Sequence, residues 1–261
     1  MNRNPLPSRA GNALVTGSSR RIGRAIALAL AGDGWTVGLH GRAATAESET
    51  LKSEIEALGG SAYIATADLA DETACRAMAA AAVEAAGPLT CLINNASLFE
   101  RDDLASVSRD SWRAHMDTNL WAPVVLSQAM AATLPSGATG NIVNIIDQRA
   151  VNMSPGFLSY SVSKSALWAL TQNLALSLAP SIRVNAIGPG PTLPSPRQSA
   201  EQFARQAART PLGHGAPPEE IAAGVRYILS APSMTGQMIA LDGGQHLGWD
   251  IPGPDAEPID E

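Results

Sequence analysis

Short apolar segments alternate with segments of helical pattern along most of the chain, and this alternation constrains the fold more than any other feature. The apolar segments have the length and composition of strands. Seven strands are predicted in this way, at residues 13–16, 35–40, 61–65, 89–93, 141–146, 182–187 and 238–241. Strands that alternate with helices pair in parallel and are covered by those helices. The pattern therefore predicts an α/β fold, doubly wound, with about seven parallel strands and helices on both faces of the sheet.

The chain of 261 residues shows no break in composition that would separate a second domain. A single domain is therefore expected over residues 12–249. Residues 1–11 are polar and contain two prolines, and they are predicted to form a flexible N-terminal tail. Residues 250–261 are acidic and rich in proline, and they are predicted to form a flexible C-terminal tail.

Charge and hydropathy argue against several classes of protein. The net charge of -6 at pH 7 disfavours nucleic acid as a partner, because phosphate binding needs a basic face. No apolar run reaches the roughly 18 residues of a membrane span, and the N-terminus lacks the apolar centre of a signal peptide. A cytoplasmic protein with neither membrane nor nucleic-acid partners is expected. The four histidines lack the spacing of metal ligands, so no metal site is expected.

A glycine-bearing turn follows the first predicted strand. Gly17 and Gly23 enclose this turn, and a helical pattern comes directly after it. A strand, a turn and a helix in this order present free helix N–H groups to a phosphate. Arg20 and Arg21 add two cations where a pyrophosphate would lie. The spacing differs from the G-x-G-x-x-G fingerprint, and an ordinary tight turn is the alternative interpretation.

Arg42 follows the second predicted strand, where folds of this kind hold an adenosine ribose. Enzymes that use NAD place an Asp or Glu at this point, and none appears before Glu47. An arginine can instead pair with a 2′-phosphate. The position therefore favours NADP over NAD, and a solvated loop residue is the alternative.

Tyr160 and Lys164 lie four positions apart in a predicted long helix that runs to about residue 178. Positions i and i+4 share one face of a helix, so the phenol and the ammonium are expected to project together. The cation should lower the pKa of Tyr160 from its ordinary value of about 10. A tyrosine with such a pKa can exchange protons with a substrate near neutral pH. The alternative is an exposed pair on a solvated face.

With these motifs in order, the chain resembles the short-chain dehydrogenase/reductase family from about residue 12 to residue 245. The matching residues are Thr16, Gly17, Ile22, Gly23, Asp68, Leu69, Asn94, Asn95, Ala96, Asn119, Tyr160, Lys164, Asn185, Pro189, Gly190, Asp242, Gly243 and Gly244. The resemblance implies a Rossmann fold and hydride transfer from NADPH to a small-molecule substrate. It also implies a homotetramer that pairs the helices near 109–132 and 158–178 and the C-terminal strand.

The resemblance assigns roles to single residues as well. Tyr160 would donate a proton, and Lys164 would hold the nicotinamide ribose. Asn119 would kink its helix and anchor a water that feeds protons to Lys164. The residues implied to contact the cofactor are Gly17, Ser19, Arg20, Arg21, Ile22, His40, Arg42, Asp68, Leu69, Asn95, Ala96, Ser97, Tyr160, Lys164, Pro189 and Gly190.

Two departures from the usual family pattern resemble the pteridine reductase branch, which includes bacterial dihydropterin reductases. Arg21 stands where the turn usually has glycine, and Asp147 stands where the fifth strand usually ends in the catalytic serine. The segment that ends at Phe99 is similar to the Asn-Asn-Ala-Ser-x-Phe of that branch, whose phenylalanine stacks on a pterin. The resemblance then places Arg21, Phe99, Asp147 and Tyr160 at the substrate, with Ser97 bonded to cofactor or substrate.

The role of Asp147 is open at this point. A neutral carboxyl would donate to the substrate, a carboxylate would accept from an amino-pyrimidine edge, and a structural residue would only cap the next loop. The substrate is also open: a pterin or dihydropterin is favoured, and a carbonyl compound such as an oxoacyl thioester, sugar or quinone is the alternative. A catalytically idle nucleotide-binding scaffold is a third interpretation. Residues 191–216 are expected to form the substrate lid.

Overall fold

The computed structural model describes residues 11–153 and 156–248, and a seven-stranded parallel sheet lies at its centre. The strand order is β3-β2-β1-β4-β5-β6-β7. The strands are β1 (Asn12–Val15), β2 (Thr36–Gly41), β3 (Ser61–Thr66), β4 (Leu89–Asn94), β5 (Gly140–Ile145), β6 (Ile182–Pro189) and β7 (Met238–Leu241). The predicted α/β class and strand number are confirmed. The order reverses at β1 and β4, as it does in a Rossmann fold.

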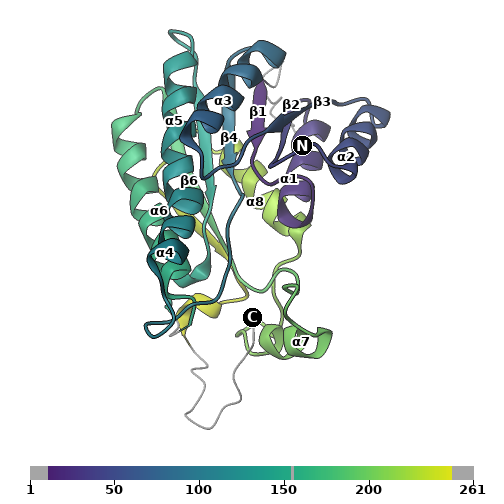
Figure 1. Cartoon of the computed structure of the whole chain (residues 1–261). Coiled ribbons are helices and arrows are strands. Elements are labelled where there is room, and N and C mark those ends of the chain that lie inside the picture. Colours follow the sequence, from purple (N-terminus) through teal and green to yellow (C-terminus); the bar gives the residue numbers. More distant parts are fainter. Residues whose placement is uncertain (1–10, 154–155, 249–261) are drawn as a thin grey trace.

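Helices cover both faces of this sheet (Figure 1). They are α1 (Arg21–Gly32), α2 (Ala46–Ala57), α3 (Glu72–Ala86), α4 (Arg109–Met116), α5 (Ala122–Thr133), α6 (Leu158–Ser177), α7 (Ala200–Ala208) and α8 (Pro218–Ser230). Successive side chains of a strand point to opposite faces, so β1 contributes to two core layers. Ala13 and Val15 pack in the layer of α1, α2 and α8, and Leu14 packs in the layer of α3 and α5.

The sequence predicts a helix over about residues 109–132 that is interrupted only near Pro123, and the structure interrupts it earlier. α4 passes into a π-helical turn, η1 (Asp117–Trp121), and α5 follows directly. Pro123, where the interruption is predicted, instead lies in the first turn of α5. Proline fits there because residues in the first turn of a helix donate no N–H hydrogen bond within that helix, so the N–H that proline lacks is not needed. The buried Asn119 lies within the π-helical turn, which agrees with the kink expected at that residue.

Other predicted elements agree closely with the structure. The helix predicted to start after Asp71 is α3, and the Asp71 carboxylate caps it by accepting from the N–H groups of Thr73 and Ala74. The helices predicted near 199–208 and from Pro218 onward are α7 and α8. Local capping and periodicity therefore determine most of these boundaries.

The segments that follow the strands gather at the carboxyl edge of the sheet, which is where folds with this strand order bind ligands. A 3-10 helix, η2 (Gln148–Ala150), follows β5, and a second one, η3 (Gln245–Leu247), follows β7. The predicted lid, residues 191–216, follows β6 and carries α7. The predicted flexible tails, residues 1–11 and 250–261, lie outside the described residues except for Gly11. Within the described chain, no helix is both long enough and apolar enough to cross a membrane.

Candidate active site

The turn between β1 and α1 is built from backbone and leaves no room for side chains at its glycines. Gly17 has φ of +63°, which only glycine adopts without strain. A Cβ on Gly23 would lie 2.2 Å from the Gly17 carbonyl oxygen and 2.6 Å from Asn95 Nδ2. The loop after β4 is fixed to the same turn, because Asn95 Nδ2 donates to Thr16 O at 2.8 Å and Ala96 N donates to Thr16 Oγ1 at 2.9 Å.

The first turn of α1 is suited to an anion. Its N-cap residue, Arg20, makes no side-chain cap, and no acidic residue occupies the first turn. The positive end of the helix dipole and the N–H groups that the helix itself cannot pair therefore face this position. With the close approach of Gly17 and Gly23, these features fit the pyrophosphate of a dinucleotide.

The Arg21 side chain contacts the segment after β6, and the contact expected with a pyrophosphate or a pterin stays a prediction. Its backbone has φ of +57°, in the left-handed region that glycine favours, which explains why the family usually has glycine here. Its guanidinium donates to the carbonyl oxygens of Leu193 at 3.0 Å and Pro194 at 2.7 Å. Arg21 thus joins the glycine turn to the lid.

Two residues expected at the cofactor are used inside the protein. The His40 ring is buried; its Nδ1 accepts from Gly17 N at 3.0 Å and its Nε2 lies 3.2 Å from Ala67 O. The side chain of Leu69 lies in the core. The His40 ring thus supports the turn and the Leu69 side chain packs in the core, and contact of either residue with a cofactor stays a prediction.

Of the remaining cofactor positions, Asp68 and Arg42 lie at the surface of this edge, whereas Pro189 is buried. Asp68 is exposed and caps its own turn by accepting from Ala70 N, and Arg42 is exposed just after β2. A Cβ on Gly190, after β6, would lie 2.6 Å from Asp242 Cα. Glycine is therefore required where the chain passes from β6 into the lid.

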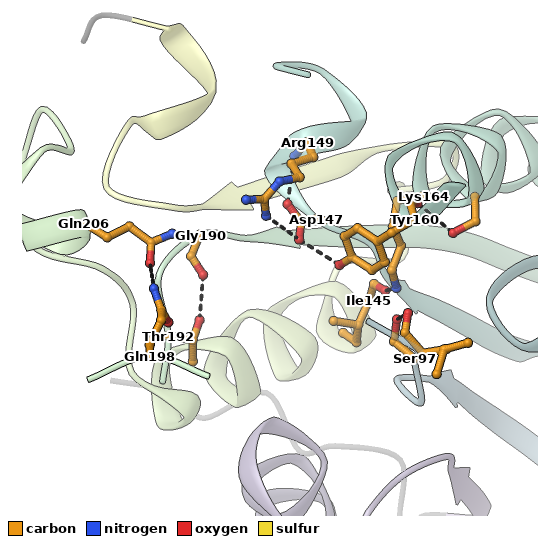
Figure 2. Close-up of polar contacts among 12 residues, drawn as sticks. Ser97, Ile145, Asp147, Arg149, Tyr160, Lys164, Gly190, Thr192, Gln198 and Gln206 are labelled. Carbon is orange, nitrogen blue, oxygen red and sulfur yellow. Dashed lines mark hydrogen bonds and ion pairs between the residues drawn. The ribbon is translucent and has the colours of Figure 1, made fainter. Parts of the chain in front are cut away.

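Asp147, Tyr160 and Lys164 lie together at the ends of β5 and α6 (Figure 2). The Tyr160 hydroxyl donates to Asp147 Oδ2 at 2.7 Å. The other carboxylate oxygen, Oδ1, accepts from Arg149 N at 2.8 Å and so caps η2. Lys164 Nζ is buried, donates to Ile145 O at 2.9 Å, and lies 5.8 Å from the centre of the Tyr160 ring. Asp147 therefore caps η2 with one oxygen and accepts from Tyr160 with the other, and its chemical role stays a prediction.

The expected low pKa of Tyr160 is wrong for the ligand-free structure. Burial raises the pKa of Tyr160 well above its ordinary value, and the charge and hydrogen bond of Asp147 raise it further. These causes outweigh the charge of Arg149 and the hydrogen bond of Ser97, which act to lower the pKa of Tyr160. Burial also lowers the pKa of Lys164 to about 8, although Asp147 acts against this shift. Tyr160 therefore keeps its proton through the neutral range.

Asn119 connects three segments of the site through its buried side chain. Its Oδ1 accepts from Leu98 N at 2.7 Å, and its Nδ2 donates to Leu98 O at 2.9 Å and to Ser163 Oγ at 3.0 Å. Ser97 Oγ lies 3.3 Å from the same Oδ1. These contacts fix the loop after β4 against the helix of Tyr160. The expected water relay to Lys164 stays a prediction.

Aromatic rings form one wall beside Tyr160. The rings of Phe99 and Phe157 stack with centres 4.5 Å apart and an angle of 5° between their planes, and Phe99 meets Tyr160 edge-on at 4.7 Å. The lid closes on this wall through Arg197, whose guanidinium lies 5.5 Å from the Phe99 ring centre and pairs with Glu100 at 2.8 Å.

Three residues of this site are absent from the sequence-based prediction: Arg149, Phe157 and Arg197. Arg149 lies two positions after Asp147, so its place at the carboxyl end of a strand was the available signal. Phe157 begins the α6 helix from a left-handed conformation, with φ of +61°, which no sequence pattern indicates. Arg197 lies in the predicted lid, but only the folded structure brings it to Phe99.

Comparisons with known proteins now identify the class. The family model described as enoyl-(acyl carrier protein) reductase matches residues 17–246. An uncharacterized oxidoreductase of Methylorubrum extorquens is 35% identical over 240 residues, which cover 89% of this chain and 96% of the relative. The 3-oxoacyl-[acyl-carrier-protein] reductase of Synechocystis sp. is 30% identical over 238 residues, which cover 89% and 95%. The chain belongs to the short-chain dehydrogenase/reductase family, a family of oxidoreductases.

Solved structures add more specific similarities. FolM alternative dihydrofolate reductase 1 from Brucella canis has a TM-score of 0.89 at 44% identity, with 95% of this chain and 97% of that chain covered. The FolM protein from Brucella suis has a TM-score of 0.89 at 46% identity, with 93% and 97% covered. A short-chain dehydrogenase from Burkholderia cenocepacia has a TM-score of 0.85 at 35% identity, with 90% and 98% covered. All three were solved in complex with NADP, the cofactor expected from the sequence.

Proposed function

We propose that this oxidoreductase uses NADPH to reduce a pterin, with dihydropterins and dihydrofolate as the first candidates. One observation carries the proposal: the Tyr160 hydroxyl is bonded to the carboxylate of Asp147 directly beside the Phe99 ring. A carboxylate cannot donate to a ketone oxygen as a serine hydroxyl does, but it can accept from the N–H groups of a pterin. Similarity to two proteins described as alternative dihydrofolate reductases supports this substrate class.

The cofactor would be held by the glycine turn, by the first turn of α1 and by the loop at Asn95. When bound, NADPH supplies the hydride. Arg42, exposed after β2, is placed to pair with a 2′-phosphate, with Arg20 contributing a second nearby cation. This arrangement favours NADPH over NADH.

Tyr160 supplies the proton in this account. Its raised pKa keeps the hydroxyl protonated at neutral pH, so it is available as a general acid. The Lys164 ammonium, 5.8 Å from the ring centre, stabilises the phenolate that remains after proton transfer. Asn119 holds Ser97 and the loop after β4 in place next to this group.

Phe99 provides the stacking surface for a flat heterocycle. Its ring is only partly buried, and one neighbour, Phe157, fixes its orientation by parallel stacking. Aromatic stacking contributes about 0.5–1.5 kcal/mol beyond the burial of area. Arg197 closes the lid over the same ring, so the lid and the platform together would select flat substrates.

A carbonyl reductase is the second candidate function. The observation in its favour is the similarity to 3-oxoacyl-[acyl-carrier-protein] reductases, at 30% identity over most of both chains. The same Tyr160 and Lys164 would serve such a substrate. Asp147 is the residue that distinguishes the two candidates, because its carboxylate repels a carbonyl oxygen.

The direct test is NADPH oxidation by the purified protein with dihydrobiopterin, dihydrofolate and an acetoacetyl thioester as alternative substrates. The proposal expects kcat/KM for a dihydropterin or dihydrofolate to exceed that for the thioester by at least about 100-fold, a difference of about 2.7 kcal/mol in transition-state stabilisation. A preference for the thioester would support the carbonyl reductase instead. Absence of turnover with every substrate, despite tight NADPH binding, would support an idle scaffold.

We also infer a homotetramer, on the family resemblance and on apolar side chains that remain exposed on the helices named for the interface. Leu176 on α6 is 83% exposed, and Trp112 on α4 is 39% exposed. Light scattering at micromolar concentration should give four times the chain mass of 27.0 kDa. A monomeric mass would refute this assembly.

A further inference from the structure

Arg149 is a largely buried arginine beside Asp147 and Tyr160. Its side chain is 10% exposed, and its Nη1 lies 3.6 Å from Asp147 Oδ2, the same oxygen that accepts from Tyr160. The guanidinium also lies 5.3 Å from the Phe157 ring centre and 5.9 Å from the Phe99 ring centre. Figure 2 shows the Arg149 side chain directed at the Asp147 carboxylate.

Burying a guanidinium is costly unless an anion and π-faces compensate for the lost water. Asp147 supplies the anion, and the two phenylalanine rings supply the faces. The arrangement also constrains Asp147, because its Oδ1 is held by the Arg149 N–H and its Oδ2 by the Arg149 guanidinium and the Tyr160 hydroxyl. One residue therefore sets the direction of the carboxylate through contacts to both of its oxygens.

We infer that Arg149 is a positioning residue for the reaction: it holds the Asp147 carboxylate turned toward Tyr160, so that Asp147 accepts hydrogen bonds from the substrate. One consequence of this inference is that the substrate presents N–H donors, as an amino-pyrimidine edge does. That consequence rests on the proposed function. Of the donor and acceptor roles that the sequence leaves open for Asp147, the inferred role of Arg149 selects the acceptor role.

Few other charged or titratable groups of the described chain face Asp147. α6 contributes Tyr160 and Lys164, and the Lys164 cation interacts electrostatically with Asp147. η3, which packs against η2, contributes His246, and that ring is paired with Asp242 at 2.8 Å. Arg149 is thus the cation within ion-pair distance of Asp147 in this set, and its removal should leave the Asp147 carboxylate without that ion pair.

The test compares Arg149→Gln, Asp147→Asn and the double variant, first by thermal unfolding of the ligand-free protein at pH 8 and pH 5. Arg149→Gln leaves a carboxylate without its cation. Such a group binds a proton more readily in the folded than in the unfolded protein, so the destabilisation is present at high pH and shrinks as the pH falls. We expect Tm to drop by roughly 5–10 °C at pH 8 and by less than half of that at pH 5.

In the Asp147→Asn background, the Arg149→Gln change should lose this pH dependence, because no carboxylate remains to take up the proton. Arg226→Gln is the matched control: Arg226 pairs with Asp33 far from the site and is 53% exposed. A drop in Tm that is equal at both pH values, and that persists in the Asp147→Asn background, would overturn the inference. If Arg149→Gln does not fold, the double variant decides: it should be at least as stable as Asp147→Asn, and lower stability would mean that Arg149 acts by packing alone.

The second measurement is KM for the dihydropterin at pH 6 and pH 8. For Arg149→Gln we expect KM to rise about tenfold on going from pH 8 to pH 6, while the parent and Arg149→Lys change by less than threefold. A purely structural role would raise KM equally at both pH values and would contradict the inference. If the parent reduces no dihydropterin, the proposed function fails, and the unfolding experiment still decides the role of Arg149.

Discussion

The nucleotide side and the substrate side of this site are built in different ways. The nucleotide side consists of backbone and small residues that lie close in sequence, such as Gly17 and Gly23, with one long-range contribution from Asn95. The substrate side consists of side chains from segments far apart in the chain, including Phe99, Asp147 and Arg197. The nucleotide side leaves no space for added atoms at these glycines. On the substrate side, single side chains can be substituted one at a time, which suits a region that defines specificity.

The largest effect is expected on the substrate side, at the proton donor. Tyr160→Phe removes the hydroxyl that donates to Asp147 and should reduce turnover by about 10²- to 10⁴-fold. NADPH affinity should change little, since the ring remains. Steady-state NADPH oxidation and a fluorescence titration of NADPH measure the two quantities. Tyr227→Phe is the control, because Tyr227 is 57% exposed on α8, and equal activity of the two variants would exclude Tyr160 as the acid.

The nucleotide side should respond to a single added methyl group. In Gly23→Ala the new Cβ would lie 2.2 Å from the Gly17 carbonyl oxygen, so backbone must move. Overpacking of this kind costs about 1–3 kcal/mol, which corresponds to a fall in Tm of about 2–12 °C for a domain of this size. Thermal unfolding measures it.

Gly32→Ala, in the same helix, is the matched control. A Cβ at Gly32 meets no atom within 4 Å, and alanine is the better helix former, so Tm should stay the same or rise. If the two variants unfold at the same temperature, the close approach at Gly23 does not constrain the turn.

A smaller and more selective effect is expected at the aromatic wall. Phe99→Ala removes a stacking surface worth about 0.5–1.5 kcal/mol, so dihydropterin affinity should fall by roughly two- to twelvefold before lost burial is counted. NADPH affinity should hardly change. Leu104→Ala, on the same loop and 87% exposed, controls for loop effects. Equal KM values for these variants would remove Phe99 from the substrate contacts.

The smallest predicted effect concerns pH. The pKa of Lys164 is lowered to about 8 by burial, so the cation beside Tyr160 is lost as the pH rises through that value. Turnover should therefore fall by about half near pH 8 if this cation stabilises the phenolate. Lys164→Arg keeps its charge at higher pH and should move the decline upward, relative to its own maximum. A profile of kcat from pH 6.5 to 9.5 that declines at the same pH in both proteins would contradict this role.

The contrast between the two sides also explains what the sequence could predict. Strand alternation, the cap at Asp71 and the spacing of Tyr160 and Lys164 are local patterns, and the structure agrees with them. The pKa of Tyr160 could not be predicted from that spacing, because burial and the charge and hydrogen bond of Asp147 raise it and outweigh the Arg149 charge that acts to lower it. His40 fits the same explanation: the family resemblance implies a cofactor contact, but its ring is used to support the Gly17 turn.

The account depends most directly on Asp147. The decisive measurement therefore compares the parent with Asp147→Ser. In each protein it determines the ratio of kcat/KM for a dihydropterin to kcat/KM for an acetoacetyl thioester. Serine restores the residue usual in the family and exchanges a carboxylate acceptor for a hydroxyl donor. The account predicts a ratio that falls by at least about tenfold, with dihydropterin turnover reduced and thioester turnover equal or higher. An unchanged ratio, with dihydropterin reduced as well as by the parent, would contradict it and favour the carbonyl reductase.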